Sequence, residues 1–243
     1  MARFFVDTEE LNLENPVLVD ENAAHARVLR LKAGEEVLLC DGKGVECLCA
    51  VETVAADCVK LKVLERRAAS SEASVKVSVY MAFPKSDKLE HVIQKATELG
   101  AYEIVAFPSA RCISKPDEKS LKKKVERWKK IASAAAEQSG RGIVPEVLVL
   151  GSYTEALKRA GEADMPLFFY ENEHATTLRM ALESGSFQTV SLLTGPEGGL
   201  EEREVEQAKA AGFKICTLGS RILRCETAPL CALSAVMYAA GEF

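Results

Sequence analysis

Three ionisable residues stand close together near the end of the chain, just before an uncharged run. Arg221, Arg224 and Glu226 fall within six positions, and residues 228–240 carry no charge. One interpretation is a local ion-pair network that holds a loop. The other is a polar reaction site against an apolar wall, where fixed charges act strongly on a developing anion.

A glycine-rich turn leads into a helix-like stretch at 194-TGPEGGLEEREVEQAKAAG-212. Its glycines allow a tight turn and close approach of the backbone to a ligand, although the spacing matches neither a dinucleotide-binding motif nor a P-loop. Four glutamates crowd the helix start: Glu197, Glu201, Glu202 and Glu204. They suit the helix dipole but would repel a phosphate placed there. The ligand should therefore be neutral or positively charged, as S-adenosylmethionine is, unless these acids only cap a surface helix.

The elements that must position these residues alternate between strand-like and helix-like patterns from residue 75 onward. The apolar, strand-like runs are 75–83, 103–108, 167–171, 189–195 and 214–219. Helical faces lie between them, one within 84–100 and another from Leu121 to Ala135. This alternation predicts an α/β domain with a mostly parallel sheet, whose ligands bind beyond the carboxyl ends of the strands. Three loops of this kind are 170–175, 194–212 and 217–229.

A terminal helix is expected to begin at Thr227 or Ala228, with Pro229 in its first turn, where a missing N–H costs little. The side that should be buried carries Leu230, Leu233, Val236 and Met237. The helix is so uniformly apolar that more than one side must be covered, either by the domain itself or by another subunit.

The first 70 residues carry the pattern of a small antiparallel barrel. Strand-like segments at 36–40, 45–54 and 58–65 are separated by short turns. Residues 68–74 are small and polar, which predicts a linker to the α/β part of the chain.

The cysteines and histidines do not favour a metal site. The eight cysteines include no C-x-x-C pair, and the chain has three histidines. A zinc site and a disulfide framework are therefore both disfavoured, and no metal is expected. Reduced thiols are typical of a cytoplasmic protein, and no apolar run is long enough to span a bilayer, so no membrane partner is expected.

Positive charge is concentrated in the middle of the chain. The formal net charge of the whole chain is −5, yet residues 71–145 carry 14 basic and 9 acidic groups. Seven basic residues and one acid lie within 119-KSLKKKVERWKK-130. This segment is either a patch that meets phosphates or the solvated face of an amphipathic helix.

Two C-terminal segments make the sequence resemble a known family. The segments 194-TGPEGGLEEREVEQA-208 and 218-LGSRILRCETAPLCALSAV-236 closely resemble the 16S ribosomal RNA uracil-N3 methyltransferase family, whose α/β domain is of the SPOUT class with a C-terminal trefoil knot. Residues 25–44 resemble its N-terminal PUA-like barrel, and 85–112 and 127–147 resemble its middle signatures. The chain departs from the family at Leu200 and Glu201, which weakens the expected helix cap, and at Cys225.

The resemblance implies two domains: residues 1–70 as a PUA-like β-barrel that binds RNA, and residues 74–243 as the SPOUT methyltransferase domain. It also implies methylation of N3 of a specific uridine in small-subunit ribosomal RNA by S-adenosylmethionine, in a homodimer. Arg224 is then the first choice for stabilising the uracil anion, with Arg221 second and Glu226 as proton acceptor or orienting group.

The residues implied to bind the cofactor are Tyr170, Glu171, Leu193, Thr194, Gly195, Pro196, Glu197, Gly198, Gly199, Leu218, Gly219, Ile222, Leu223, Arg224, Thr227 and Ala228. Those expected to bind RNA are Arg27, Arg30, Lys32, Lys122, Lys123 and Lys124. Two alternatives are a SPOUT enzyme that acts on transfer RNA and a non-catalytic RNA-binding assembly factor with a vestigial cofactor pocket. The intact GPEGG and ILRCETA segments argue against the second.

Overall fold

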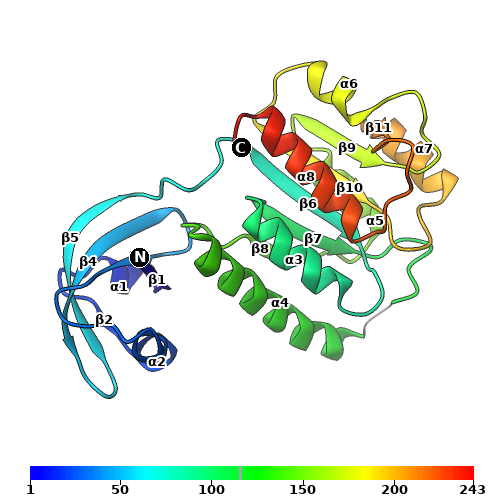
Figure 1. Ribbon diagram of the computed structural model, residues 1–243. Coiled ribbons are helices and arrows are strands. Elements are labelled where there is room, and N and C mark those ends of the chain that lie inside the picture. Colours follow the sequence, from blue (N-terminus) through cyan, green and yellow to red (C-terminus); the bar gives the residue numbers. More distant parts are fainter. Residues whose placement is uncertain (115–116) are drawn as a thin grey trace. The chain divides into compact units, whose positions relative to one another are not determined.

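A computed structural model describes residues 1–114 and 117–243 (Figure 1). The chain divides into two compact units. The first consists of Met1–Glu72 and Ala136–Val144, and the second of Ala73–Ala135 and Pro145–Phe243. The first unit therefore includes a short stretch that is distant from the rest of it in sequence.

The first unit is built on a five-stranded mixed sheet that forms a half-barrel, in the order β1-β3-β4-β5-β2. The strands are β1 Ala2–Phe5, β2 Val17–Leu18, β3 Glu36–Cys40, β4 Val45–Val54 and β5 Val59–Ala68, and the helices are α1 Thr8–Leu11 and α2 Asp20–Val28. Strand β1 pairs with β3 in parallel, and the other pairs are antiparallel. The three predicted strands pair antiparallel as expected, and the parallel edge strand β1, which was not predicted, makes the sheet mixed.

Alternation along β4 explains why this sheet has one buried face. Cys47, Cys49 and Val51 are buried in the core of the first unit, whereas Leu48 and Ala50 between them are only half-buried. A period of two places one set of side chains on each face of a strand. The cysteines act here as small apolar side chains rather than as ligands.

Glu72 attaches the stretch 136–144 to the first unit. Its carboxylate accepts hydrogen bonds from the backbone N–H groups of Gly142 at 2.8 Å and Ile143 at 3.0 Å. The same carboxylate pairs with Arg141 at 2.7 Å, and the Arg141 side chain is buried. The Glu72 carboxylate, at the end of the segment Met1–Glu72, therefore holds the segment Ala136–Val144 in the same unit.

The second unit holds a six-stranded sheet in the order β11-β9-β10-β6-β7-β8, and every pair in it is parallel. Its strands are β6 Lys76–Ala82, β7 Glu103–Phe107, β8 Glu146–Val149, β9 Met165–Phe169, β10 Thr189–Thr194 and β11 Lys214–Cys216. Its helices are α3 Lys88–Glu98, α4 Glu118–Ser139 (which continues into the first unit), α5 Tyr153–Ala160, α6 Leu178–Glu183, α7 Glu202–Ala210 and α8 Thr227–Ala239. The predicted fold class, a small barrel followed by a parallel α/β domain, is confirmed.

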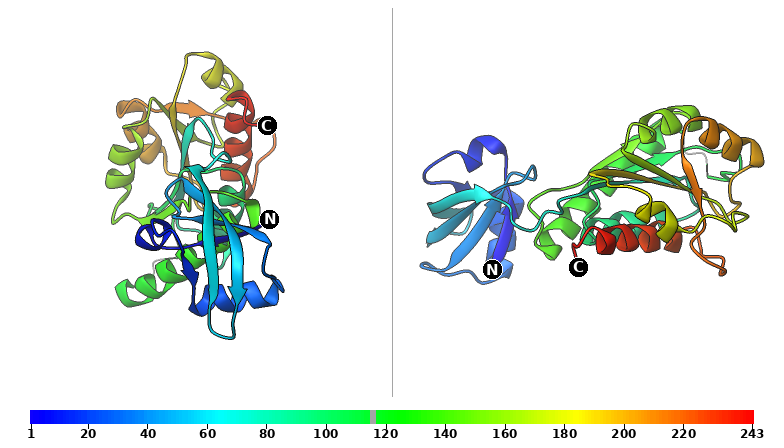
Figure 2. Two further views of the ribbon diagram at one scale, coloured as in Figure 1. Left: turned by 90° about the vertical axis from the view of Figure 1, so that its left-hand side faces the viewer. Right: turned by 90° about the horizontal axis from the view of Figure 1, so that it is seen from above.

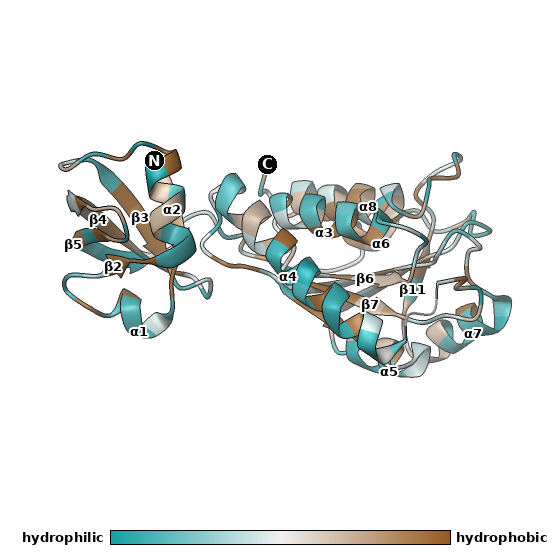
Figure 3. Cartoon of the chain, turned by 90° about the horizontal axis from the view of Figure 1, so that it is seen from below, coloured by the Kyte–Doolittle hydropathy of each residue, from teal (hydrophilic) through white to brown (hydrophobic). Residues whose placement is uncertain are grey.

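Helices cover both faces of the parallel sheet. Helices α3, α6 and α8 lie on one face, and α5 and α7 lie on the other (Figure 2). Helix α8 packs against β6, β10 and α3, whereas α5 packs against β6, β7 and β10. The strands between these layers are largely hydrophobic (Figure 3), as strands buried on both faces must be.

The terminal helix α8 buries one side and exposes the other. Leu233, Val236 and Met237 are buried as expected, whereas Leu230 is only half-buried, and Pro229 lies in the first turn. On the outer side Tyr238 is 74% exposed. The residues that the structure describes therefore cover one side of the apolar helix and leave Tyr238 open to solvent.

Candidate functional site

Three loops meet at the carboxyl edge of the parallel sheet, after the neighbouring strands β11, β9 and β10. The backbone N–H of Tyr170 donates to the carbonyl of Cys216 at 3.1 Å. Thr217 donates to the carbonyl of Thr176 at 2.9 Å, and Leu178 donates to that of Thr217 at 3.2 Å. The loops that follow β9 and β11 are therefore tied together, at the edge where ligands of parallel sheets bind.

The two adjacent glycines of the turn are required by neighbouring loops of the protein. Gly199 has a φ of +68°, and a Cβ there would collide with the carboxylate of Glu171. A Cβ on Gly198 would lie 3.2 Å from the Cβ of Arg111 and 3.4 Å from its carbonyl oxygen. The guanidinium of Arg111 also donates to the Gly198 carbonyl at 3.1 Å. The structure shows close approach of the turn to Glu171 and Arg111, and close approach to a cofactor stays a prediction.

Leu200 packs its side chain against Gly195 within the glycine-rich turn. Its side chain is 1% exposed, and a Cβ on Gly195 would lie 2.9 Å from its Cγ. Thr194, just before the turn, is buried and donates from its hydroxyl to the carbonyl of Tyr80 at 3.3 Å. Leu200 is therefore an apolar anchor for the turn.

Glu204 stabilises the start of α7 and is buried. One carboxylate oxygen accepts from the backbone N–H of Glu201 at 2.8 Å, and the other accepts from the N–H of Ala110 at 2.9 Å. The first bond satisfies a donor at the helix N-terminus, and the second ties the helix to the loop after β7. The capping interpretation is therefore confirmed for Glu204.

Glu197 has a different partner. Its carboxylate pairs with the ammonium of Lys88, the first residue of α3, at 3.0 Å, and the same ammonium pairs with Glu226 at 3.2 Å. The backbone N–H of Lys85 donates to Glu197 at 3.0 Å. The thiol of Cys225 donates to Glu226 at 3.2 Å. Lys88 thus joins the glycine-rich turn to the residues just before α8.

These contacts set the ionisation of the cluster. Burial acts to raise the pKa of Glu197, but hydrogen bonds from its own N–H and from Lys88 outweigh it and hold the pKa below its ordinary value. Glu226 behaves in the same way, with the Cys225 thiol and Lys88 as donors. Burial, reinforced by Glu226, raises the pKa of the Cys225 thiol to about 12, and the hydrogen bond to Glu197 raises the pKa of Lys88. Near neutral pH the site therefore holds two carboxylates, one ammonium and an un-ionised thiol.

Arg221 and Arg224 are exposed, and their side chains pair with no residue that the structure describes. An ion-pair network does hold this loop, as one interpretation expected, but its cation is Lys88 rather than either arginine. The backbone carbonyl of Arg224 accepts from Thr227 at 2.9 Å and Ala228 at 3.0 Å, which starts α8. Sequence reasoning missed Lys88 because it lies more than one hundred positions before its partners.

The remaining residues implied to bind the cofactor lie on the same three loops or at the strand ends that lead to them. Leu193 and Pro196 are buried, Leu218 and Leu223 are half-buried, and Ile222 is 87% exposed. Of the residues expected to bind RNA, Arg27, Arg30 and Lys32 are exposed in the first unit, and Lys122 and Lys123 are exposed on α4 while Lys124 is half-buried. The residues implied to bind the cofactor and the residues expected to bind RNA therefore lie on different helices and loops.

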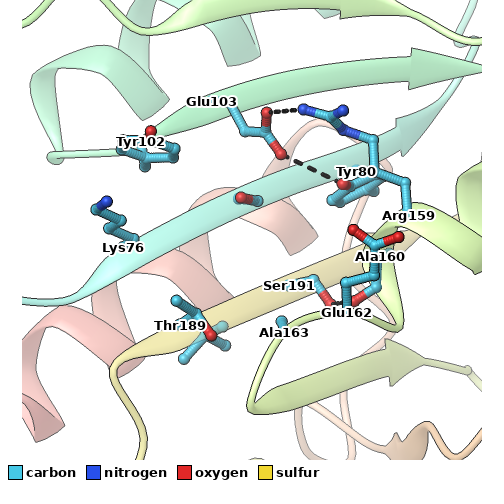
Figure 4. A pocket seen from close by; sticks show the side chains of 12 residues that line it. Lys76, Tyr80, Tyr102, Glu103, Arg159, Ala160, Glu162, Ala163, Thr189 and Ser191 are labelled. Carbon is cyan, nitrogen blue, oxygen red and sulfur yellow. Dashed lines mark hydrogen bonds and ion pairs between the residues drawn. The ribbon is translucent and has the colours of Figure 1, made fainter. Parts of the chain in front are cut away.

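A cavity of about 230 Å³ lies at the opposite, amino-terminal end of the strands (Figure 4). In its wall Glu103, whose side chain is 8% exposed, accepts from Tyr80 at 3.2 Å and pairs with Arg159 at 2.7 Å. These polar groups already satisfy one another. The polar side chains in the wall of this cavity therefore form a structural ion-pair network, unlike the exposed arginines at the loops.

In the part of the chain that the structure describes, no group of three or more His, Cys, Asp or Glu side chains is arranged to hold a metal ion. None of the helices in that part has an apolar stretch that could span a bilayer.

Comparison with known proteins connects this geometry to a family. A family profile described as an RNA methyltransferase domain matches residues 71–237, and one described as an RNA methyltransferase PUA domain matches residues 18–64. Ribosomal RNA small subunit methyltransferase E of Bacillus subtilis is 38% identical, in an alignment that covers 98% of this chain and 96% of that protein. The chain belongs to the ribosomal RNA small subunit methyltransferase E family.

Solved structures of relatives share the whole fold. The methyltransferase E structure from Neisseria gonorrhoeae, bound to S-adenosylmethionine, is 33% identical with a TM-score of 0.83, covering 98% of this chain and 97% of that one. A putative methyltransferase from Legionella pneumophila, also bound to S-adenosylmethionine, is 28% identical with a TM-score of 0.84 and the same coverage. The family resemblance seen in the sequence is confirmed, and the second unit is of the SPOUT class.

Proposed function

We propose that this methyltransferase E family member transfers a methyl group from S-adenosylmethionine to N3 of a specific uridine in 16S ribosomal RNA, which gives 3-methyluridine. The observation that carries the proposal is the meeting of the glycine-rich turn, the 170–175 loop and the 217–226 loop at one sheet edge. Family membership over nearly the whole chain supports it.

The residues present fit this cofactor by charge and by backbone chemistry. The turn is acidic at Glu197, Glu201 and Glu202, which disfavours a phosphate ligand and suits a sulfonium. Residues 220–223 make no hydrogen bond to any residue that the structure describes, so their backbone groups are available to a ligand. When bound, S-adenosylmethionine supplies a methyl group already activated on sulfur. The loop at 218–223, the turn at 194–199 and Tyr170 would hold it.

The residues before α8 would act on the uracil. N3 carries a proton, and the reactive form is the anion spread over O2, N3 and O4. A guanidinium near O2 or O4 favours that anion, and Arg224 is free of ion pairs with described residues, so it can meet the base. Arg221 is the second choice. Since Lys88 and Cys225 hold the carboxylate of Glu226, orientation of Arg224 by Glu226 has no support from the contacts.

RNA would be held by both domains. We propose residues 1–70 as the RNA-binding domain and residues 74–243 as the catalytic domain. In the first, Arg27, Arg30 and Lys32 present exposed positive charge. Lys122, Lys123 and Lys124 on α4 would add phosphate contacts, which raise affinity without reading the sequence. The target base must leave its stack to reach the loops.

The experiment that tests this function compares ribosomal RNA from a host with and without the gene. Mass spectrometry of nucleosides from the small subunit should show 3-methyluridine only when the gene is present. Purified protein with labelled S-adenosylmethionine should then label isolated small subunits and not transfer RNA. Labelled transfer RNA would instead support the first alternative, and cofactor binding without transfer to any RNA would support the assembly factor.

A further inference from the structure

We infer that Lys88 is a positioning residue that holds two loops of the cofactor site in register, the glycine-rich turn through Glu197 and the head of α8 through Glu226. The inference rests on the proposed function for the identity of the cofactor. Neither loop's sequence pattern points to a partner on α3, so the assignment comes from the geometry.

The contacts converge on one ammonium. Its distances to the carboxylates of Glu197 and Glu226 are 3.0 and 3.2 Å, and it lies 3.7 Å from the sulfur of Cys225. Among the residues that the structure describes, no other side-chain cation pairs with either glutamate. The side chains of all three charged residues are between 21% and 28% exposed, so the cluster is partly sheltered from water.

Without this cation the two loops would repel each other. Glu197 precedes Gly198 and Gly199 in the turn, and Glu226 ends the loop that carries Arg224. Two carboxylates that share one partner are left facing each other when that partner is removed, and like charges in a sheltered place separate. The turn and the 217–226 loop would therefore move apart, and both carry residues implied to bind the cofactor.

The same contacts separate the roles of the residues before α8. The carboxylate of Glu226 is occupied by the Lys88 ammonium and the Cys225 thiol. Arg224 is exposed next to it and has no such partner among described residues. Lys88 thus fixes Glu226 as part of the scaffold and leaves the guanidinium of Arg224 for the substrate.

The test measures cofactor binding and methyl transfer separately. Lys88→Met removes the charge and retains much of the side-chain length, and Lys88→Arg restores a cation. Lys95→Met is the matched control because, among the residues that the structure describes, Lys95 pairs only with Glu98 on its own helix. Calorimetry with S-adenosylmethionine should show at least tenfold weaker binding for Lys88→Met, partial recovery for Lys88→Arg and no change for the control. The single-turnover rate on small subunits at saturating cofactor should fall less than about threefold, because a positioning residue acts on binding.

A double-mutant cycle keeps the inference testable if Lys88→Met is less stable. Glu197→Gln should cost less affinity in the Lys88→Met background than in the native chain, since the two residues act through one contact. Additive losses, or unchanged cofactor affinity in a folded Lys88→Met protein, would overturn the inference. A native chain that binds S-adenosylmethionine and leaves uridine unmethylated would contradict the proposed function while this binding test still stood.

Discussion

At the scale of single residues, the chemistry depends on which charged side chains already form ion pairs or hydrogen bonds within the protein. Glu197 and Glu226 are held by Lys88, and Glu204 is held by backbone donors at the start of α7. The side chains of Arg224 and Arg221 are exposed and form no ion pair with any residue that the structure describes. A charge that is not neutralised by its own protein can act on a transition state, so the arginines remain the candidates for catalysis.

Substitution of Arg224 should slow the chemical step itself. A guanidinium stabilises a delocalised uracil anion more than the neutral base, so we expect Arg224→Ala to lower the single-turnover rate on bound RNA roughly a hundredfold, the scale of losing one oxyanion donor. Arg224→Lys should recover only part, because lysine lacks the planar fork. Raising the pH should partly rescue Arg224→Ala, because more of the uracil is then ionised by solvent.

The matched control is Arg179→Ala, an arginine that pairs with Glu183 on α6. Its single-turnover rate should equal that of the native chain. Near-normal transfer by a stable Arg224→Ala protein would end the catalytic hypothesis.

Gly198 gives a second test at this scale. A valine there would press on the Cβ and carbonyl oxygen of Arg111, and the loop after β7 would have to shift away from the turn. We expect Gly198→Val to weaken S-adenosylmethionine binding at least tenfold, which is about 1.4 kcal/mol, with RNA affinity much less changed. Gly185→Val is the control, since a Cβ at Gly185 would meet nothing within 4 Å. Calorimetry that finds native affinity in folded Gly198→Val would refute the placement.

At the scale of elements, sequence patterns located most of the strands, including the three-residue β11, and missed β1, β2 and β8. The predicted strands at 36–40 and 45–54 coincide with β3 and β4, because their alternation spans enough residues to be visible. Strand β2, Val17–Leu18, is too short to show any period. β1 joins the sheet by parallel pairing with β3, which no local pattern records.

In the candidate site, likewise, features contained in one short segment were predictable and contacts between distant segments were not. The loops, the glycine turn and the residues before α8 were predictable, since each carries its signal within one short segment. The pairing of Lys88 with Glu197 and Glu226 was not, because it depends on how α3 packs beside α8. The contact of Gly198 with Arg111 was not predictable either, because Arg111 is contributed by a different loop.

The network at the amino-terminal end of the strands should affect stability and not cofactor binding. Arg159→Met leaves the buried carboxylate of Glu103 with Tyr80 as its remaining side-chain donor among described residues. We expect a loss of about 1–3 kcal/mol in the free energy of unfolding, the cost of a buried group that loses its partner, toward the low end because Arg159 is partly exposed. Urea unfolding measures this loss. A variant that keeps native stability, or one that loses cofactor affinity, would contradict the structural role.

At the scale of the whole molecule, we predict a homodimer that uses the outer side of α8. Residues 228–240 carry no charge, yet Tyr238 is 74% exposed and Cys231 is exposed on that helix. An uncharged helix side left open to water is unusual in a monomer, and a second copy would cover it. Light scattering of the full chain at micromolar concentration should give twice the 26.4 kDa chain mass.

Tyr238→Glu should shift the protein toward monomer, because a buried unpaired carboxylate is costly. Tyr102→Glu, a control at an exposed tyrosine beside the cavity of Figure 4, should leave the mass unchanged. A compact monomer in the native chain would show that α8 is left open in solution.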